Sequence, residues 1–210
     1  MIAPDKTSNS PHFNSGRPSG VGVVIHSTRS GKPNYAFELV ACMNWFANPA
    51  SQVSSHWIIG RQGEKVRVIQ DHLQAWHAGA HNATHWGIEL EQGVESDGFT
   101  DAQIDALVEV CKGYVSDFGV SPVHSPSTTI SGFIGHQETT QGKGAGKTDP
   151  GNLFPWERFI AGLNPQAPVY APGDVAMACV SAAHFTRMNW NLGDLLPSEK
   201  EILRWIASQV

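Results

Sequence analysis

The sequence predicts an α/β fold in which helices flank a central mixed β-sheet, with a short, mainly helical tail at the C-terminus. Short apolar segments typical of strands alternate along the chain with longer segments whose apolar residues have helical spacing. The expected strands lie together near the middle of the chain, as in one sheet covered by helices. With 210 residues, of which 40% are hydrophobic, the chain is long enough to bury one full core.

The chain begins with an arm, a strand and a helix. Residues 1–20 are polar and rich in Ser, Pro and Asn, so we expect an extended arm. The next segment, Val21–His26, is a β-branched run that suits a buried strand. Apolar residues at helical spacing predict a helix over Tyr35–Phe46, which Asn48-Pro49 should end.

Three further strands are expected before the middle of the chain. Ser54–Gly60 and Lys65–Ile69 read as strands joined by a tight turn, which predicts a hairpin. Asp71–Thr84 is dense in His, Trp, Ala and Gly and should be a loop. His85–Glu91 alternates apolar and polar residues, which is typical of a strand with one polar face.

The second half contains two helices and a long irregular segment. Thr100 can cap an amphipathic helix that runs from Asp101 to about Phe118. Val120–Gly151 is rich in Gly and Pro and should be irregular, and segments of this length in a compact domain usually carry function. Pro155–Leu163 has proline where a helix begins and predicts a short helix.

The C-terminal part predicts a separate region. Residues 164–173 contain three prolines and read as a semi-rigid linker. Residues 174–210 have helical spacing, but the segment is too short to form an independent domain with its own core. We therefore expect either a helical tail or a partial module. The predicted organisation is thus an arm over residues 1–20, a domain over 21–163, a linker over 164–173 and a tail over 174–210.

Composition and charge exclude several classes. The net charge of −5 and the absence of Lys/Arg runs argue against a nucleic-acid-binding surface. No apolar run is as long as a membrane span. The first residues lack a basic start followed by an apolar core, so we expect no signal peptide and synthesis in the cytoplasm. The odd number of cysteines (Cys42, Cys111 and Cys179) favours free thiols.

Three separated residues are candidate metal ligands. His26 ends the first strand, His136 follows a glycine in the irregular segment, and Asp149 precedes Pro-Gly. Each alone has an ordinary structural interpretation as a strand-end histidine, a loop histidine or a turn aspartate. Together, two imidazoles and one carboxylate suit Zn²⁺ and leave a fourth position open for a reactive water.

Six sequence blocks, in a fixed order over Val21–Leu163, surround these ligands: Val23-Val24-Ile25-His26-Ser27-Thr28, Ser55-His56-Trp57-Ile58-Ile59 with Gly63-Glu64, Ala75-Trp76-His77-Ala78-Gly79, Trp86-Gly87-Ile88-Glu89-Leu90-Glu91, Gly135-His136 and Lys147-Thr148-Asp149-Pro150-Gly151. In them the chain resembles the zinc-dependent N-acetylmuramoyl-L-alanine amidases of the phage lysozyme-type and peptidoglycan-recognition group. The resemblance implies that His26, His136 and Asp149 bind zinc. An aspartate as third ligand matches bacterial cytosolic anhydromuropeptide amidases and many phage enzymes, whereas many relatives have cysteine there.

The resemblance also implies catalytic roles. Glu89, on the polar face of its strand, matches the family's general base and acid, and Glu91 is its rival on the same face. Lys147 would stabilise the developing oxyanion. Trp76 offers an apolar face to the substrate, and His77 a donor to the substrate or the oxyanion.

His56 has two interpretations that we weigh equally. It either forms hydrogen bonds near the site, as a substrate-binding residue would, or is a satisfied core histidine.

The implied activity is zinc-dependent hydrolysis of the amide between the lactyl group of N-acetylmuramic acid and L-alanine of the stem peptide. The first interpretation is a monomeric phage endolysin that acts on cell-wall peptidoglycan after release from the cytoplasm. The alternatives are a cytoplasmic amidase that recycles anhydromuropeptides and a non-catalytic peptidoglycan-recognition module.

Overall fold

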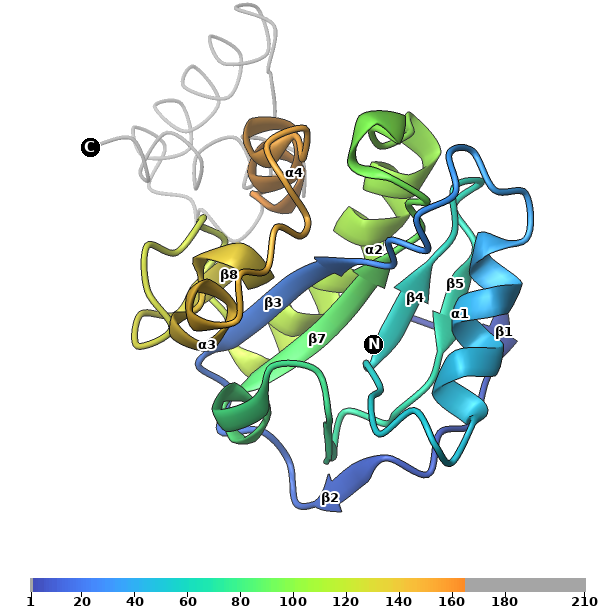
Figure 1. The fold of residues 1–210 in the computed structure, drawn as a ribbon. Coiled ribbons are helices and arrows are strands. Elements are labelled where there is room, and N and C mark those ends of the chain that lie inside the picture. Colours follow the sequence, from blue (N-terminus) through green and yellow to red (C-terminus); the bar gives the residue numbers. More distant parts are fainter. Residues whose placement is uncertain (1, 165–210) are drawn as a thin grey trace, which may run out of the picture. The chain divides into compact units, whose positions relative to one another are not determined.

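The computed structural model describes residues 2–164, and it confirms the predicted α/β class. Its centre is a six-stranded mixed sheet with the strand order β1-β5-β4-β7-β3-β8 (Figure 1). The strands of this sheet are β1 (Lys6–Thr7), β3 (Gly22–Ser27), β4 (Trp57–Ile59), β5 (Lys65–Arg67), β7 (His85–Leu90) and β8 (Gly132–Gly135). Strands β2 (Phe13–Ser15) and β6 (Leu73–Ala75) form a separate antiparallel pair.

The sheet is parallel at its centre. Strand β3 pairs in parallel with β7 on one side and β8 on the other, and β4 is parallel to β7. The predicted hairpin is confirmed, because β5 is antiparallel to β4. The carboxyl ends of β3, β4, β7 and β8 therefore meet at one edge of the sheet, where sites in α/β proteins form.

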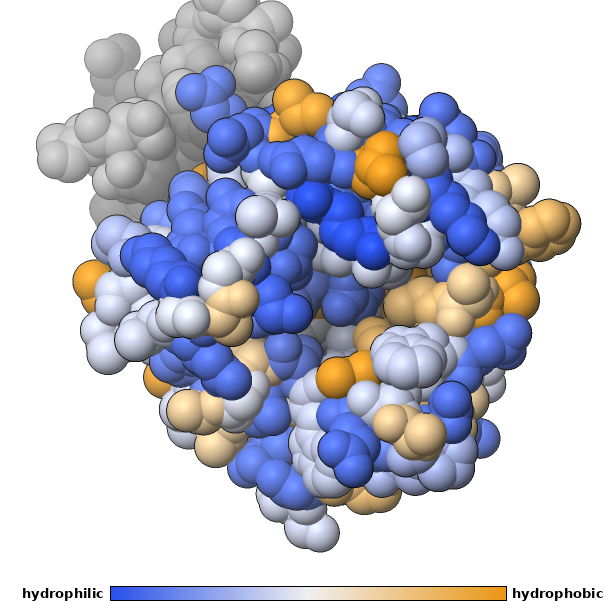
Figure 2. All heavy atoms as spheres, viewed as in Figure 1, coloured by the Kyte–Doolittle hydropathy of each residue, from blue (hydrophilic) through white to orange (hydrophobic). Residues whose placement is uncertain are grey.

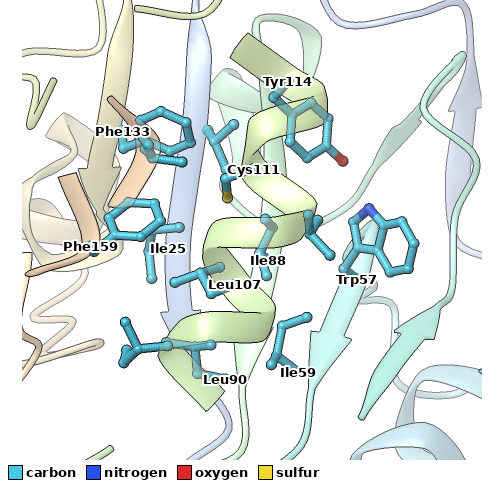
Figure 3. Packing of buried hydrophobic residues seen from close by; sticks show 14 of the residues in the cluster. Ile25, Trp57, Ile59, Ile88, Leu90, Leu107, Cys111, Tyr114, Phe133 and Phe159 are labelled. Carbon is cyan, nitrogen blue, oxygen red and sulfur yellow. The ribbon is translucent and has the colours of Figure 1, made fainter. Parts of the chain in front are cut away.

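Helices cover both faces of this sheet. Helices α2 (Asp101–Phe118) and α4 (Trp156–Leu163) pack on one face, where Leu107, Cys111 and Phe159 meet Ile25 and Ile88 (Figure 3). Helix α1 (Glu38–Ala47) packs on the other face. The split between faces follows the strand period of two.

Strand β4 shows this alternation. Trp57 and Ile59 belong to the core beneath α2, whereas Ile58 belongs to the core beneath α1.

The helix boundaries follow local capping. Thr100 accepts a hydrogen bond from the Gln103 backbone N–H and begins α2 as predicted, and Gly119 ends it with a left-handed φ of 72°. Helix α1 begins at Glu38, later than the predicted Tyr35. Phe37 directly precedes the helix, with a φ of −110° and a ψ of 15° that are not helical, and it supplies no side-chain cap.

The structure contains elements that the sequence pattern did not predict. The arm expected over residues 1–20 contributes β1 and β2, and the loop expected over Asp71–Thr84 contributes β6 and the 3-10 turn η1 (Gly79–Ala83). The irregular segment contains β8, the 3-10 turn η3 (His136–Glu138) and the short helix α3 (Thr140–Gly144). All of these elements are short. The strands among them form because each pairs with a strand that is distant in the sequence.

Other predictions concern thiols, membranes and the C-terminus. Cys42 and Cys111 are free and buried, whereas Cys179 lies outside the described residues. No helix within residues 2–164 is long and apolar enough to cross a membrane. The predicted tail over 174–210, and the predicted linker apart from Asn164, also lie outside the described range.

Candidate metal centre and active site

The paired strands β3 and β7 place two of the predicted residues side by side. His26 is directly opposite Glu89 in the parallel register of these strands. Both are offset by one residue from Ile25 and Ile88, which point into the core beneath α2. Because neighbouring residues of a strand point to opposite faces, His26 and Glu89 project together toward the α1 face at the carboxyl edge of the sheet.

His136 and Asp149 reach the same edge from the segment after β8. His136 begins the turn η3 directly after the strand. The Gln137 backbone N–H donates to the Asp149 carbonyl oxygen at 2.8 Å, and Gln137 Oε1 accepts from the Gly151 backbone N–H at 3.0 Å. These bonds hold the Asp149 loop against the turn that carries His136.

The three predicted ligands converge with a spacing that suits zinc. Asp149 Oδ2 lies 3.2 Å from His26 Nδ1 and 3.1 Å from His136 Nδ1, and the three ligand atoms lie within 4.8 Å of one another. Two ligands bound at about 2.0–2.1 Å to one tetrahedral zinc lie about 3.3 Å apart. The geometry therefore fits three ligands of one tetrahedral ion.

Hydrogen bonds behind His26 determine which of its nitrogens faces Asp149. His77 Nε2 lies 3.1 Å from the carbonyl oxygen of His85, which can only accept, so Nε2 of His77 carries a proton. Burial holds the pKa of His77 well below its usual range, so its Nδ1 is an acceptor. His26 Nε2 therefore donates to His77 Nδ1 across 3.0 Å.

This proton arrangement leaves an unprotonated nitrogen opposite a carboxylate. Burial lowers the pKa of His26, so its ring is neutral and its Nδ1 is bare. Burial alone would raise the pKa of Asp149, but the neighbouring imidazole rings of His136 and His26 lower it far below its usual value, so this group is a carboxylate. Two acceptors at 3.2 Å repel each other unless a cation lies between them. The donor set thus fits a metal ion.

His77 has a position that the sequence did not predict. It was expected to donate to the substrate or the oxyanion, but in this structure both of its ring nitrogens have protein partners. It orients His26 from behind, as partners in the outer shell of metal sites do.

His56 is a satisfied core histidine, which is one of its two predicted interpretations. It is fully buried, with Nδ1 accepting from the Gly87 backbone N–H at 2.9 Å and Nε2 donating to the Leu73 carbonyl at 3.0 Å. It does not line the cavity described below. Its inaccessibility corrects the expectation that it binds substrate.

Glu89 and its rival Glu91 have different surroundings. Glu91 Oε1 accepts from the Leu39 backbone N–H at 3.1 Å, and its Oε2 accepts from the Arg61 backbone N–H at 2.7 Å. Glu89 Oε2 is buried without a hydrogen-bond partner among residues 2–164. Burial, then the charge of Asp149, raises the pKa of Glu89 to about 8. A carboxyl that titrates near neutral pH suits proton transfer, so the geometry favours Glu89 over Glu91.

Lys147 and Trp76 line the same open cavity. Lys147 is exposed, yet its charge contributes to the lowered pKa of His26 and opposes the raised pKa of Glu89, which places the ammonium within electrostatic reach of both. Trp76 Nε1 donates to Asn14 Oδ1 at 3.2 Å, and its ring lies 5.3 Å from that of His12. This contact anchors the predicted aromatic face at the rim.

The cavity has a volume of about 590 Å³ and opens on the α1 side of the sheet. Figure 2 shows the hollow near the centre of the view, with hydrophilic residues along its upper rim and hydrophobic residues on the side of α1. Its lining comprises His26, Ser27, Thr28, Arg29, Ser30, Glu38, Ala41, Cys42, Trp45, Phe46, Val53, Ser54, Trp76, His77, Glu89, His136, Gly146, Lys147, Thr148 and Asp149.

Arg29 is a positioning residue that sequence reasoning missed. Its Nη2 donates to the Pro150 carbonyl at 3.0 Å, and its Nη1 lies 3.4 Å from Thr148 Oγ1. It therefore holds the residues on either side of Asp149, while its Nε donates to Gln92 Oε1 at 2.7 Å. Its closeness to His26 in sequence was the only signal, and that does not reveal partners more than a hundred positions away.

The sequence of this chain is similar to those of known amidases. A family model described as N-acetylmuramoyl-L-alanine amidase matches residues 16–152. The chain is 27% identical over 132 residues to N-acetylmuramoyl-L-alanine amidase A of Achromobacter lyticus, covering 58% of this chain and 75% of that protein. It is 35% identical over 118 residues to 1,6-anhydro-N-acetylmuramyl-L-alanine amidase AmpD of Salmonella typhimurium, covering 52% of this chain. That match spans only 57% of the AmpD protein.

Solved structures show the same fold. A crystal structure of a selenomethionine derivative of AmpD superimposes with a TM-score of 0.60 at 27% identity, covering 78% of this chain and 97% of the other. The amidase LysC from Clostridium intestinale superimposes with a TM-score of 0.52 at 18% identity, covering 78% of this chain and all of the other, which supports the fold alone. The matched residues 16–152 include the converging His26, His136 and Asp149. The chain belongs to the N-acetylmuramoyl-L-alanine amidase family of enzymes.

Proposed function

We propose that this chain is a zinc-dependent amidase that cleaves the amide between the lactyl group of N-acetylmuramic acid and L-alanine of the stem peptide. Family membership supports the bond that is cut. The metal requirement is supported above all by one observation: His26 Nδ1 faces the carboxylate of Asp149 at 3.2 Å, while the other ring nitrogen of His26 lies 3.0 Å from His77 Nδ1.

The residues of the cavity divide the chemistry among them. His26, His136 and Asp149 would hold the zinc ion, whose chemistry is to lower the pKa of a water molecule and polarise the scissile carbonyl. Glu89 takes the proton from the attacking water and delivers it to the leaving amine of L-alanine, as the new C–O bond forms and the C–N bond breaks. Lys147 stabilises the negative charge that develops on the carbonyl oxygen.

The activity can be tested with defined muropeptides and mass spectrometry. The purified protein should contain about one zinc per chain. It should release the intact stem peptide from N-acetylmuramoyl peptides, and chelation should abolish the release until zinc is restored. Tight muropeptide binding without zinc and without any released peptide would instead identify a non-catalytic recognition module.

Two biological roles are compatible with this activity. An endolysin would digest intact sacculi after release from the cytoplasm, and the structures of the endolysin LysCS from Clostridium intestinale and of a mutant endolysin from Bacillus subtilis share the fold. A cytoplasmic recycling enzyme would cleave soluble anhydromuropeptides, and the 35% identity to the anhydromuropeptide amidase AmpD supports this role. Rates on intact sacculi and on soluble anhydromuropeptides, measured side by side with one enzyme preparation, separate the two.

A further inference from the structure

One face of helix α1 forms a wall of the cavity. The residues that line the cavity from α1 are Glu38, Ala41, Cys42, Trp45 and Phe46, which recur at the three- and four-residue spacing of a single helix face. This face is apolar except for Glu38, which lies at the helix N-terminus. Val53, beyond the helix, continues the apolar lining.

The Glu38 carboxylate is only half satisfied. The side chain is 3% exposed. Its Oε1 accepts from Thr28 Oγ1 at 2.5 Å and from the Ser30 backbone N–H at 3.2 Å. Its Oε2 is buried and has no hydrogen-bond partner among the described residues. Leaving a buried acceptor unmatched is unfavourable, and most such groups have a partner.

A purely structural role accounts for only one of the two oxygens. A carboxylate in the first turn favours the helix N-terminus, and the bonds from Thr28 and Ser30 hold the chain before α1. Both effects use Oε1 or the net charge. Neither explains why Oε2 remains unmatched in a residue that lines the cavity together with Glu89 and the candidate metal ligands.

A ligand group that matches this face of α1 would be small and apolar and would carry one hydrogen-bond donor for Glu38. We infer that Glu38 Oε2 is a specificity-determining acceptor for a secondary amide N–H next to a methyl group of the substrate, with the methyl packed on the apolar face of α1. This inference rests on the proposed function. A muramoyl peptide carries this chemistry in two places: the acetamido group of the sugar, and the alanine residue with the amide that follows it.

The substitution Glu38→Gln tests the acceptor with little change of shape. The donors Ser30 N–H and Thr28 O–H keep the amide oxygen at the position of Oε1, so the NH₂ group replaces Oε2 and presents a donor to a donor. We expect the KM for a muropeptide, and its Kd measured by calorimetry, to rise about tenfold or more. The value of kcat should stay within about twofold.

Two substrate analogues identify the donor. One carries an acetoxy group in place of the acetamido group, and the other an ester in place of the amide after alanine. The analogue that lacks the relevant N–H should bind the wild-type protein about tenfold more weakly, but should bind Glu38→Gln no worse than the parent compound does. If neither analogue distinguishes the two proteins, the inference is overturned.

Further measurements separate this role from others. Glu157→Gln, at an exposed site on α4, is the matched carboxylate-to-amide control and should change neither KM nor Kd. A shifted pH profile of kcat with an unchanged Kd would mean that Glu38 acts only through the charge of Glu89, and would overturn the inference. If Glu38→Gln does not fold, the wild-type protein must still bind one of the two analogues about tenfold more weakly than the parent muropeptide, and equal binding of all three compounds overturns the inference. Because calorimetry needs no turnover, absent cleavage would reject the proposed activity without deciding the role of Glu38.

Discussion

Two carboxyl groups, Glu89 in strand β7 and Glu91 directly after that strand, illustrate how environment assigns roles at the scale of the residue. Both oxygens of Glu91 accept hydrogen bonds from backbone N–H groups, one from Leu39 and one from Arg61. These bonds connect the end of β7 to the start of α1 and to the turn after β4. Glu89 keeps a buried oxygen without a partner in the described structure. Their identical chemistry gives no hint of this difference in the sequence.

The contrast predicts opposite effects of the same substitution. Glu89→Gln should retain zinc and fold stability but lower kcat by about 10²-fold or more, because the amide cannot accept and return a proton. Glu91→Gln should retain proton transfer but lower the free energy of unfolding by about 2 kcal/mol, since its NH₂ group would face a backbone N–H. Steady-state kinetics, metal analysis and urea unfolding of both variants check this. A fully active Glu89→Gln would transfer the role to Glu91.

At the scale of the element, the pairing of β3 with β7 places His26 in the candidate metal centre and leaves space behind it for the His77 ring. The register sets His26 beside Glu89, and Gly87, two residues before Glu89, lets the His77 ring pack directly on the strand. A Cβ atom at position 87 would lie 2.5 Å from Cγ of His77. The ring cannot move aside easily because both of its nitrogens are bonded.

Gly87→Ala should therefore displace His77 and loosen the orientation of His26. We expect zinc affinity to fall about tenfold or more, and the unfolding free energy to fall by about 1–3 kcal/mol from overpacking. The matched control is Gly144→Ala, where an added Cβ meets no atom within 4 Å. Zinc competition with a chromophoric chelator measures the effect, and equal affinities of the two variants would refute the role of His77.

Strands β4, β6 and β7 also enclose His56, which makes stability depend on pH. Burial lowers the pKa of His56 to about 4, below the usual value of 6.5, and burial lowers the pKa of His85 to about 4 as well. Between these values the unfolded chain binds more protons than the folded protein, so the stability present above pH 6.5 is lost as the pH falls toward 4. His56 alone contributes up to about 3 kcal/mol of this loss.

The measurement is urea unfolding between pH 7 and pH 4. His56→Gln, which cannot titrate, should flatten the pH dependence, whereas substitution of the exposed His72 should leave the slope unchanged. An unchanged slope in His56→Gln would show that other groups cause the dependence.

At the scale of the whole molecule, the candidate metal centre brings together segments that are far apart in sequence. His26 comes from β3, whereas His136 and Asp149 follow β8, and Arg29 fastens the Asp149 loop to the end of β3. A metal ion bound by all three ligands stabilises only the folded chain, since the unfolded chain does not hold them together.

Zinc removal should therefore lower global stability as well as activity. At a free zinc concentration a thousandfold above Kd, the expected gain in unfolding free energy is about 4 kcal/mol. Thermal unfolding with and without a chelator measures it. His136→Ala is the control, because its unfolding temperature should respond far less to zinc. A wild-type protein that unfolds at the same temperature in both conditions would speak against a metal site of this affinity.

Local pattern was enough to predict the fold class, the hairpin of β4 and β5, and helices α2 and α4, because apolar periodicity and capping act over a few residues. The predicted ligands His26, His136 and Asp149 converge in the structure, and six ordered blocks had indicated them together. The sequence by itself thus determined the family and indicated the set of candidate ligands.

Only the tertiary structure decided how these residues are used. It placed His77 behind His26, buried His56 in the core and paired Glu91 with backbone N–H donors. It also left one oxygen each of Glu38 and Glu89, two residues that line the cavity, without a hydrogen-bond partner among the described residues. The physical reason is that protonation state, burial and hydrogen-bond partners depend on neighbours brought together by strand register and helix packing, which lie far away along the chain.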